Sequence, residues 1–356
     1  MAKFLEVFED ATKKGTKIPT DEYLKNGKYP IIDQGQTYIS GYYNDETGLF
    51  VDVPAIIFGD HTRIIKYVDQ PCFLGADGVK LLKAKDKQAN YKYLFYVLRN
   101  AKIPNTGYNR HFKWLKELEI PIPPTEVQHQ IVSTLDKVAH TIDLCNAILE
   151  KLDLLVKSRF VEMFGEIKEK RTVAEICSII TDGTHQPPVF VESGIPFLFV
   201  SNIVTNEICY DATKYISEET YNELYKRTPI EIGDIVLSTV GSYGHPAVVK
   251  TNKQFLFQRH IAYLKPISTI INSIYLHSAI LSNDVQKQID ERVKGIAQKT
   301  LNLSEIRKIV VPIPPLYQQV KFAAFVEQTD KTKAAVQKAL DEAQLLFDSL
   351  MQEYFG

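Results

Sequence analysis

The chain has 356 residues with a formal net charge of −1, and 45% of its residues are apolar and 24% are charged. This is the composition of an ordinary soluble protein, and the length favours two or three domains. No apolar run reaches 18 residues and no secretory leader is present, so neither membrane insertion nor export is indicated. The four cysteines lie far apart without metal-ligand spacing, which fits a reducing cytosol and predicts no metal site.

Residues 1–119 form a first segment whose central part is predicted to consist of strands. Between residues 29 and 82, short runs such as YPII, AIIFG and RIIKYV are separated by Gly, Asp and Pro. Residues 90–100 (NYKYLFYVLRN) predict a short helix. The stretch 106–114 (TGYNRHFKW) is polar, basic and aromatic at once.

Residues 120–165 predict one long helix. A Pro-rich lead (IPIPP) precedes about forty residues without Pro or Gly, and a Phe-Gly pair ends the run. Thr125 with Gln128 three positions later predicts a capping box. Apolar residues recur at steps of three and four from Ile131 to Met163, which indicates a coiled-coil seam. Such a helix is on the order of 60 Å long.

Residues 166–310 form a second segment with a similar plan. Its predicted strands are 196–203 (PFLFVSNI), 231–250 around a Gly-Ser-Tyr-Gly turn, and 257–264 (FQRHIAYL). A helix is predicted at 273–282 and a loop at 294–303 (KGIAQKTLNL). Both segments therefore run from strands with Gly turns to a helix, a Gly-containing loop and a Pro-rich lead.

Residues 311–356 repeat the long helix. They align with residues 120–165 without a gap at an offset of 191, and thirteen of the 46 aligned positions are identical. The seam continues here but places Thr329 and Lys333 in its middle, where polar residues cost stability and often fix register. The layout is segment, helix, segment, helix. If the helices pair antiparallel, the two segments are related by an approximate two-fold axis.

A shorter similarity precedes each segment's strands. Residues 3–8 (KFLEVF) resemble residues 171–177 (RTVAEIC), with Glu6 matching Glu175. Each stretch stands directly after a helix repeat if the chain is imagined closed into a circle. We therefore expect the two ends of the chain to lie close together.

The charges are unevenly distributed. Each long helix carries six acidic and four basic side chains, so the rest of the chain carries a net charge of +3. This distribution hints that the globular segments face an anionic partner. An ordinary solvated surface explains it equally well.

No catalytic motif stands out in the sequence. There is no P-loop, no GxGxxG after a strand, no Asn/Asp-Pro-Pro-aromatic motif of methyltransferases, and no GxSxG or HExxH. The triplet Glu166-Ile167-Lys168 resembles part of a nuclease motif but lacks an upstream acidic partner, so we interpret it as a solvated face. The chain therefore lacks the usual motifs of adenine and cytosine methyltransferases.

Polar loops beside the Gly turns offer side chains that hydrogen-bond to base edges and phosphates, with aromatic neighbours for stacking. In the first segment the candidate DNA-binding residues are Gln34, Gln36, Thr37, His61, Thr62, Arg63, Tyr108, Asn109 and Arg110. In the second segment they are Thr184, His185, Ser201, Asn202, Ser242, Tyr243, Arg259, His260, Gln298 and Lys299.

The repeated (I/V)PIPP-x3-Q lead and the long helix with its Phe-Gly end, set after each of two dissimilar segments, resemble the specificity subunit of a type I restriction-modification system. VSNI, TVGSYGHPAVV and GIAQKTLN in the second segment are typical of that family's target-recognition domains, as are DQGQTYISGYY and the GYN loop in the first. The resemblance implies an α+β chain with two α/β target-recognition domains, 1–119 and 166–310. Two long helices, 120–165 and 311–356, would form an antiparallel coiled coil in a pseudo-two-fold arrangement.

The same resemblance implies function and partners. Each recognition domain would read one half of a split double-stranded DNA sequence, and the coiled coil would set the gap between the halves. Two modification subunits that bind S-adenosylmethionine would dock on the assembly, and restriction subunits would use ATP and Mg. The chain itself would carry no catalysis and hold no cofactor, and it would act in the cytoplasm.

Other classes of protein stay open. One is a methyltransferase or nuclease with recognition domains attached, or the recognition subunit of a related type II methyltransferase-nuclease. Binding of S-adenosylmethionine by the purified chain alone would support an enzyme. Another is a structural coiled-coil adaptor with protein ligands, which salt-insensitive behaviour towards DNA without sequence preference would favour.

Overall fold

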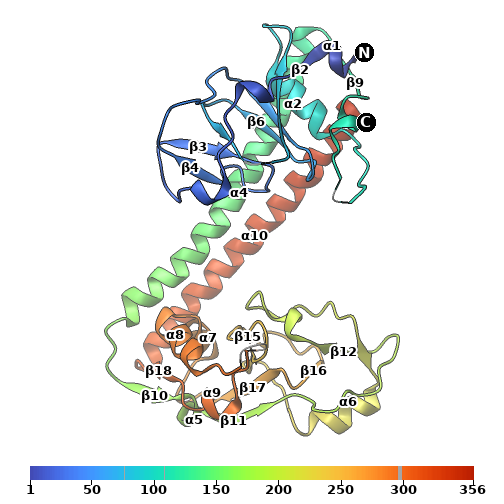
Figure 1. The fold of residues 1–356 in the computed structure, drawn as a ribbon. Helices are drawn as coiled ribbons and strands as arrows, with labels where there is room; N and C mark the ends of the chain where they lie inside the picture. Colours follow the sequence, from blue (N-terminus) through green and yellow to red (C-terminus); the bar gives the residue numbers. More distant parts are fainter. Residues whose placement is uncertain (76, 108, 296–298) are drawn as a thin grey trace. The chain divides into compact units, whose positions relative to one another are not determined.

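The computed structural model describes residues 1–75, 77–107, 109–295 and 299–356 (Figure 1). These residues form two compact units. Unit 1 comprises residues 1–146 and 338–356, and unit 2 comprises residues 147–337. Each unit has an α+β architecture with its own sheets. Each also contains part of two 40-residue helices, α4 (Thr125–Phe164) and α10 (Leu316–Phe355).

Unit 1 contains a four-stranded antiparallel sheet and a three-stranded mixed sheet. The strands of the larger sheet, in spatial order, are β2 (Phe8–Asp10), β8 (Val79–Ala84), β5 (Ala55–Gly59) and β6 (Ile65–Val68). Those of the smaller sheet are β4 (Gly41–Tyr43), β3 (Tyr29–Ile32) and β7 (Phe73–Leu74), with β3 and β7 parallel. A separate pair joins β1 (Ala2–Lys3) to β9 (Glu119–Ile120).

The shorter helices of unit 1 are α1 (Phe4–Val7), α2 (Tyr91–Arg99) and α3 (Phe112–Leu115). Helix α2 begins where the Asn90 side chain accepts a hydrogen bond from the Tyr93 N–H at 3.1 Å, which satisfies a donor that has no partner inside the helix. Its buried face joins one core with Phe58 of β5, Leu135 of α4 and Phe347 of α10. Burial of these apolar side chains fixes the sheet of unit 1 onto the two long helices.

Unit 2 has the same two kinds of sheet. The larger sheet has the order β11 (Cys177–Asp182), β17 (Ile261–Pro266), β14 (Ile235–Ser238) and β15 (Pro246–Val248). The smaller sheet has the order β13 (Tyr215–Ile216), β12 (Ile195–Leu198) and β16 (Leu256–Phe257), with β12 and β16 parallel. A separate pair joins β10 (Lys170–Thr172) to β18 (Val310–Pro312).

The shorter helices of unit 2 are α5 (Val173–Ile176), α6 (Glu218–Tyr225), α7 (Ser273–Ile280), α8 (Asn283–Arg292) and α9 (Leu303–Ile306). The helix predicted at 273–282 is thus confirmed as α7. The single strand predicted at 257–264 is wrong, because the chain turns at 258–260 between β16 of one sheet and β17 of the other. An apolar run does not reveal such a change of sheet.

The two units share one topology. Strand for strand, the order β2-β8-β5-β6 matches β11-β17-β14-β15, and β4-β3-β7 matches β13-β12-β16, including the parallel pair. The similarity of residues 3–8 to 171–177 has a local cause. Glu6 accepts a hydrogen bond from the Lys3 N–H at 2.8 Å, and Glu175 accepts one from the Thr172 N–H at 2.7 Å. The similar plan expected for the two segments is therefore present at the level of the fold.

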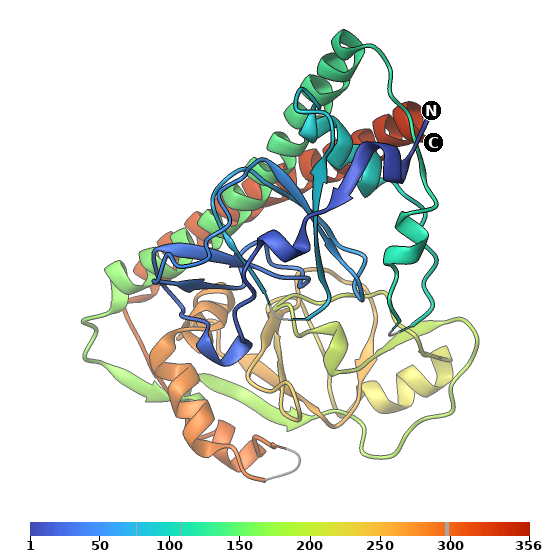
Figure 2. The ribbon, with the colours of Figure 1, turned by 45° about the horizontal axis from the view of Figure 1, so that its top comes forward.

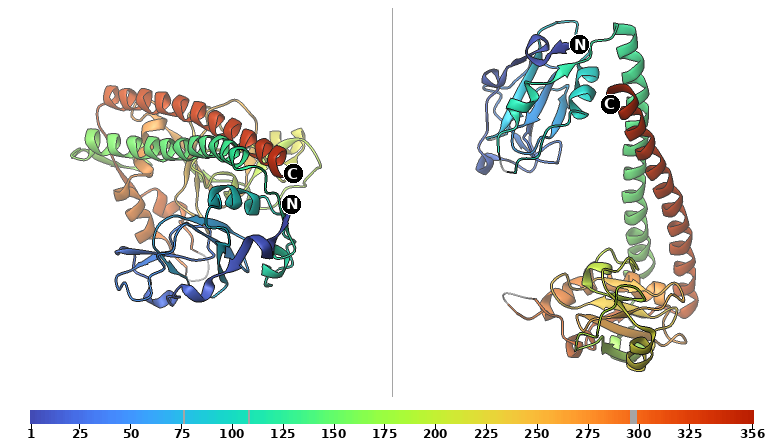
Figure 3. Two further views of the ribbon diagram at one scale, coloured as in Figure 1. Left: turned by 90° about the horizontal axis from the view of Figure 1, so that it is seen from above. Right: turned by 90° about the vertical axis from the view of Figure 1, so that its right-hand side faces the viewer.

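Within each unit the long helices run antiparallel. In unit 1, Ile131 near the start of α4 shares a core with Phe347 near the end of α10. In unit 2, the Phe160 ring near the end of α4 lies 5.6 Å from the ring of Phe322 near the start of α10. The helical parts lie side by side in every view (Figure 3). This is the seam that the spacing of apolar residues predicts.

The two polar seam positions lie in unit 2. Thr329 is buried, and its hydroxyl donates to the Phe325 carbonyl at 2.9 Å, which satisfies the hydroxyl inside its own helix. Lys333 forms an ion pair with Asp153 of α4. An apolar partner could not satisfy this ammonium group, so the pair favours one alignment of the two helices.

The Pro-rich leads are held by equivalent hydrogen bonds. The Tyr93 hydroxyl donates to the Pro121 carbonyl at 3.0 Å in unit 1, and the Tyr275 hydroxyl donates to the Pro312 carbonyl at 2.8 Å in unit 2. The capping role predicted for Gln128 is wrong. Its amide Nε2 donates to the Pro123 carbonyl at 2.9 Å instead of accepting from a backbone N–H. The side chain thus closes the Pro-rich turn, and Gln319 does the same by donating to the Pro314 carbonyl at 2.8 Å, which accounts for the repeated Gln.

The two ends of the chain lie close together within unit 1, as the circular reading of the sequence predicts (Figure 2). Near the N-terminus, β1 pairs with β9, which leads towards the start of α4. Near the C-terminus, the Phe355 ring lies 5.7 Å from the Tyr93 ring of α2. Both ends are therefore held by the core of unit 1.

Candidate nucleic-acid interface

Three loops of unit 1 meet around Gln34. Its side-chain oxygen accepts a hydrogen bond from the His61 N–H at 3.1 Å, and its amide donates to the Asp77 carbonyl at 3.1 Å. The Thr62 hydroxyl donates to the Gln34 carbonyl at 2.7 Å. The loop after β3, the β5–β6 turn and the turn before β8 are therefore joined. We call residues 33–37, 60–63, 77–78, 105–107 and 109–111 the unit 1 loops.

Residues 105–107 and 109–111 of the unit 1 loops are tied to the β5–β6 turn. The His61 Nδ1 lies 3.2 Å from the Asn109 carbonyl oxygen, and the Asn109 side chain donates to the Thr106 carbonyl. Arg63 has a φ of +64° and donates to the Ile103 carbonyl at 3.3 Å. Because αL geometry is uncommon for a residue with a side chain, these contacts hold the turn in a defined conformation.

Two residues that the sequence analysis missed fix this arrangement. His111 is fully buried, and both its backbone N–H and its Nδ1 contact the Asp60 carbonyl, at 2.8 and 2.9 Å. The buried Asp60 carboxylate accepts from the Phe112 N–H at 2.7 Å. The sequence motif NRHF at residues 109–112 contains this His, but a single His in a polar loop does not indicate that its side chain is buried.

We expect His111→Ala to loosen residues 101–110 and to lower the free energy of unfolding of unit 1 by about 1–3 kcal/mol. The substitution removes the ring donor from a buried carbonyl and leaves space behind. Hydrogen exchange and chemical denaturation would measure both effects. His129→Ala, at an exposed position of α4, is the matched control. Unchanged exchange in residues 101–110 would contradict this role of His111.

The remaining candidates of unit 1 are exposed. Gln36, Thr37 and Arg110 present their side chains to solvent, while the buried Lys66 holds the loop by donating to the Thr37 carbonyl at 2.6 Å. Tyr108 lies outside the described residues. The arrangement combines fixed backbone turns with exposed amide, hydroxyl and guanidinium groups, which suits contacts to bases and phosphates.

Equivalent loops meet in unit 2. The Thr239 N–H donates to the His260 carbonyl at 2.9 Å, the Leu301 N–H donates to the Thr239 carbonyl at 2.8 Å, and the Gly241 N–H donates to the Lys299 carbonyl at 3.1 Å. The unit 1 loops have the matching bonds, from the Asp60 N–H to Gly78 at 2.6 Å and from the His111 N–H to Asp60. We call residues 182–185, 239–243, 258–260 and 299–302 the unit 2 loops.

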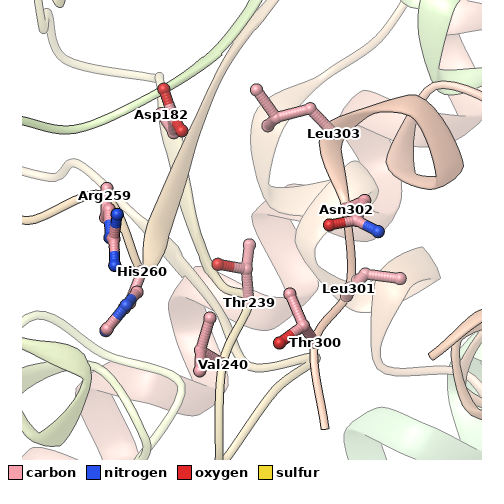
Figure 4. Close-up of a pocket in the computed structure, with 9 residues that line it drawn as sticks. All are labelled: Asp182, Thr239, Val240, Arg259, His260, Thr300, Leu301, Asn302 and Leu303. Atoms are coloured by element: carbon pink, nitrogen blue, oxygen red, sulfur yellow. The ribbon is translucent and has the colours of Figure 1, made fainter. Parts of the chain in front are cut away.

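The unit 2 loops enclose a cavity of about 440 Å³ (Figure 4). Its lining comprises Asp182, Thr239, Val240, Arg259, His260, Thr300, Leu301, Asn302 and Leu303. Partial burial, together with the neighbouring Arg259, lowers the pKa of His260 below its usual value. A neutral imidazole both donates and accepts hydrogen bonds, so at neutral pH this side chain suits a base edge.

The loop after β11 requires glycine. A Cβ atom on Gly183 would lie 2.2 Å from the Phe257 carbonyl oxygen, a backbone atom that cannot move aside. This close approach lets the Thr184 N–H donate to Phe257 at 3.0 Å and the Thr184 carbonyl accept from the Arg259 N–H at 3.1 Å. His185 is then placed beside Asp182, with Nε2 3.0 Å from the carboxylate.

The other candidates of unit 2 divide into exposed and structural residues. Ser242 is exposed at the tip of the β14–β15 turn, and the Tyr243 hydroxyl donates to Asp290 of α8 at 3.0 Å. The Lys299 ammonium lies 5.9 Å from the centre of the Tyr243 ring. Gln298 lies outside the described residues.

Ser201 and Asn202 lie at a distinct turn, the 3-10 helix η3 (Val200–Asn202). Ser201 is exposed, whereas Asn202 is buried. The Asn202 amide accepts from the Phe199 N–H and donates to the carbonyls of Cys209 and Asp211. Its hydrogen-bonding groups are thereby occupied, so we regard Asn202 as holding this loop and no longer propose a DNA contact for it.

Two further findings concern the described residues. They contain no cluster of three or more His, Cys, Asp or Glu side chains that could hold a metal ion. In the part of the chain that the structure describes, no helix is long and apolar enough to cross a membrane.

Two units of one topology, each with a polar set of loops, define a protein built from a duplicated α+β fold. A family model described as the type I restriction modification DNA specificity domain matches residues 2–154 and 166–344. These ranges cover most of the chain, so the protein belongs to this family.

Relatives and solved structures agree with this assignment. The chain is 23% identical to the type I restriction enzyme EcoBI specificity subunit of Escherichia coli, over 89% of this chain and 74% of the relative. It is 24% identical to the MjaVIII specificity subunit of Methanocaldococcus jannaschii, over 75% and 72%. Its fold matches the crystal structure of the type I restriction-modification S subunit from M. genitalium, with a TM-score of 0.64, 18% identity, and coverage of 99% and 95%.

Proposed function

We propose that this chain is the DNA-recognition subunit of a type I restriction-modification complex, and that each unit reads one half of a bipartite site. The observation that carries the proposal is the duplication of one fold with one set of loops in a chain of this family. The β5–β6 turn of unit 1 and the β14–β15 turn of unit 2 are joined to neighbouring loops by matching backbone bonds, but their sequences, DHTR and TVGSY, differ. Two different half-sites are the expected result.

The proposal divides the chain into recognition domains 1–119 and 166–310, with spacer helices 120–165 and 311–356 between and after them. The helices set the number of base pairs between the half-sites, because half-site spacing follows from the geometry of the protein. The chain contributes recognition but no catalytic group. Two modification subunits with S-adenosylmethionine, and restriction subunits with ATP and Mg, supply the chemistry in the cytoplasm.

Sequencing of methylated DNA from cells that express this chain with its modification subunit tests the proposal. We expect one motif made of two specific half-sites with a fixed unspecified gap. A continuous motif, or no methylation that depends on this chain, would contradict it. Omitting the chain while keeping the modification subunit is the matched control.

We expect Tyr243→Ala to weaken or relax only the half-site that unit 2 reads. The substitution removes a ring that is held at the edge of the unit 2 loops by Asp290, and a lost base contact costs about 1–3 kcal/mol. Methylation profiling of the variant measures both half-sites in the same DNA, so the half-site of unit 1 is an internal control. An equal effect on both would argue against separate readers.

A further inference from the structure

One carboxylate in unit 2 holds two basic side chains from distant parts of the sequence. The Asp182 carboxylate accepts from Arg227 Nη2 at 2.7 Å and from His185 Nε2 at 3.0 Å. The Asp182 side chain is 16% exposed, whereas those of Arg227 and His185 are 51% and 52% exposed. Asp182 also lines the cavity enclosed by the unit 2 loops. The carboxylate therefore lies on the shielded side of the cluster, and the guanidinium and imidazole groups face solvent.

Arg227 is placed by rigid structure. It follows α6, and its backbone N–H donates to the Leu224 carbonyl at 3.1 Å, so it lies on the last turn of that helix. The helix begins where the Ser217 side chain accepts from the Thr220 N–H at 3.2 Å, and its Tyr221 is buried in the core. The guanidinium group is thus fixed at both ends, by the helix behind it and by Asp182 at its tip.

The ion pair itself contributes little to folding, because an exposed pair of charges gains modest Coulomb energy and loses side-chain entropy. The ion pair instead orients the guanidinium group of Arg227. A guanidinium group carries five N–H donors in one plane, and among the described residues Asp182 is the one partner of the Arg227 side chain. The second N–H of Nη2 and the donors of Nη1 and Nε stay available, in a plane that the carboxylate fixes before any ligand binds.

We infer that Arg227 reads a guanine base in the half-site of unit 2, with Asp182 as the residue that positions it. This inference rests on the proposed function of the chain. Guanine presents two acceptors, O6 and N7, in the major groove, and two parallel N–H groups of arginine match them. A pre-oriented side chain loses less entropy when it makes such a bond, which raises its selectivity for one base.

A phosphate contact would not need this arrangement. Phosphates attract any nearby positive charge, and a flexible lysine serves for that purpose. The neighbouring Lys226 is such a residue, since it is exposed and has no carboxylate partner among the described residues. The pairing of Asp182 with Arg227, and not with Lys226, favours recognition of a base edge.

The test uses the full chain in complex with its modification subunits and DNA duplexes that vary one base pair at a time. For Arg227→Ala we expect discrimination at one G·C position of the unit 2 half-site to fall about tenfold to a hundredfold. The unit 1 half-site should stay unchanged. Arg227→Lys should relax the same position, because lysine keeps the charge but lacks the planar pair of donors. Lys226→Ala, which removes an adjacent charge, should leave the motif unchanged.

Asp182→Asn is the second arm, because it tests the positioning residue. We expect partial relaxation at the same G·C position. Arg227→Gln, with thermal melting compared to the unaltered chain, replaces Arg227→Ala if that variant does not fold.

Three results would overturn the inference. The first is a unit 2 half-site without a G·C pair. The second is an equal loss of affinity for all sequences with the salt dependence reduced by about one ion, which marks a phosphate contact. The third is an unchanged motif in a folded variant. Failure of the proposed function is distinguishable from all three, since the unaltered chain would then direct methylation to no bipartite motif.

Discussion

Phe322→Ala is expected to lower the free energy of unfolding of unit 2 by about 3–5 kcal/mol, a cost typical for truncation of a fully buried Phe. Phe322 is 0% exposed. Its ring centre lies 5.6 Å from that of Phe160, 5.4 Å from that of Phe164 and 6.4 Å from that of Tyr275. One ring therefore joins α10 to the end of α4 and to α7, and the surrounding rings are too rigid to fill the space it leaves.

Chemical denaturation and calorimetry each measure this loss of stability. If the two units unfold in separate transitions, the transition of unit 2 is the one that should shift. Tyr317→Ala is the matched control, because it removes an aromatic ring from the same helix at a position that is 69% exposed. Its cost should stay within about 0.5 kcal/mol. A loss below about 1 kcal/mol for Phe322→Ala would show that the aromatic cluster is not the core that fixes α10 in unit 2.

The second large effect concerns helix length. Adding four residues to each long helix inside the seam, between Asn146 and Ala147 and between Gln337 and Lys338, should lengthen the DNA gap by about two base pairs. Four residues add about 6 Å to a helix, and one base pair occupies about 3.4 Å of duplex. Both half-sites should stay the same, because no residue of the loops changes. Deleting four residues inside Ile131–Phe160 and its counterpart should shorten the gap.

Methylation profiling of the inserted variants reads the gap directly. A seven-residue insertion in both helices is a graded variant that shifts the seam by only about 20°, and it should lengthen the gap further. Four residues inserted in the exposed turn near Asp45 are the control and should leave the gap unchanged. An unaltered gap in the helix variants would refute the role of the helices as the spacer.

Local sequence signals were sufficient for the two long helices, for α2 and α7, and for many strands. The Pro-rich leads, the run without Pro or Gly and the heptad spacing are properties of neighbouring residues, and they predict α4 and α10 to within a residue or two. Helix α6 escaped this reading because its sequence, EETYNELY, is mostly polar and buries only Tyr221. The pattern of residues 257–264 likewise could not show that the chain leaves one sheet and enters another.

The contacts within the candidate site were harder to predict from the sequence for a related reason. Asp182 and Arg227 are 45 residues apart, and His111 contacts Asp60 across 51 residues. Such pairs form because the topology places the end of a strand beside a helix terminus that is distant in the sequence: Asp182 ends β11 and Arg227 follows α6, while Asp60 follows β5 and His111 precedes α3. Loop composition indicated Gln34, His61, Thr184 and His185, but not which of their neighbours hold them.

The bonds that hold the framework and the exposed side chains of the loops belong largely to different residues. This has a consequence for how such a protein diversifies. Some of the bonds that join the loops, such as those from Thr239 to His260 and from Asp60 to Gly78, use main-chain atoms alone. Others use the Gln34 and His111 side chains. The repeated Pro121 and Pro312 carbonyls hold the framework through Tyr93 and Tyr275. Under the proposed function, substitutions at exposed loop residues such as Ser242 and Arg110 would change target preference while these framework bonds stay in place.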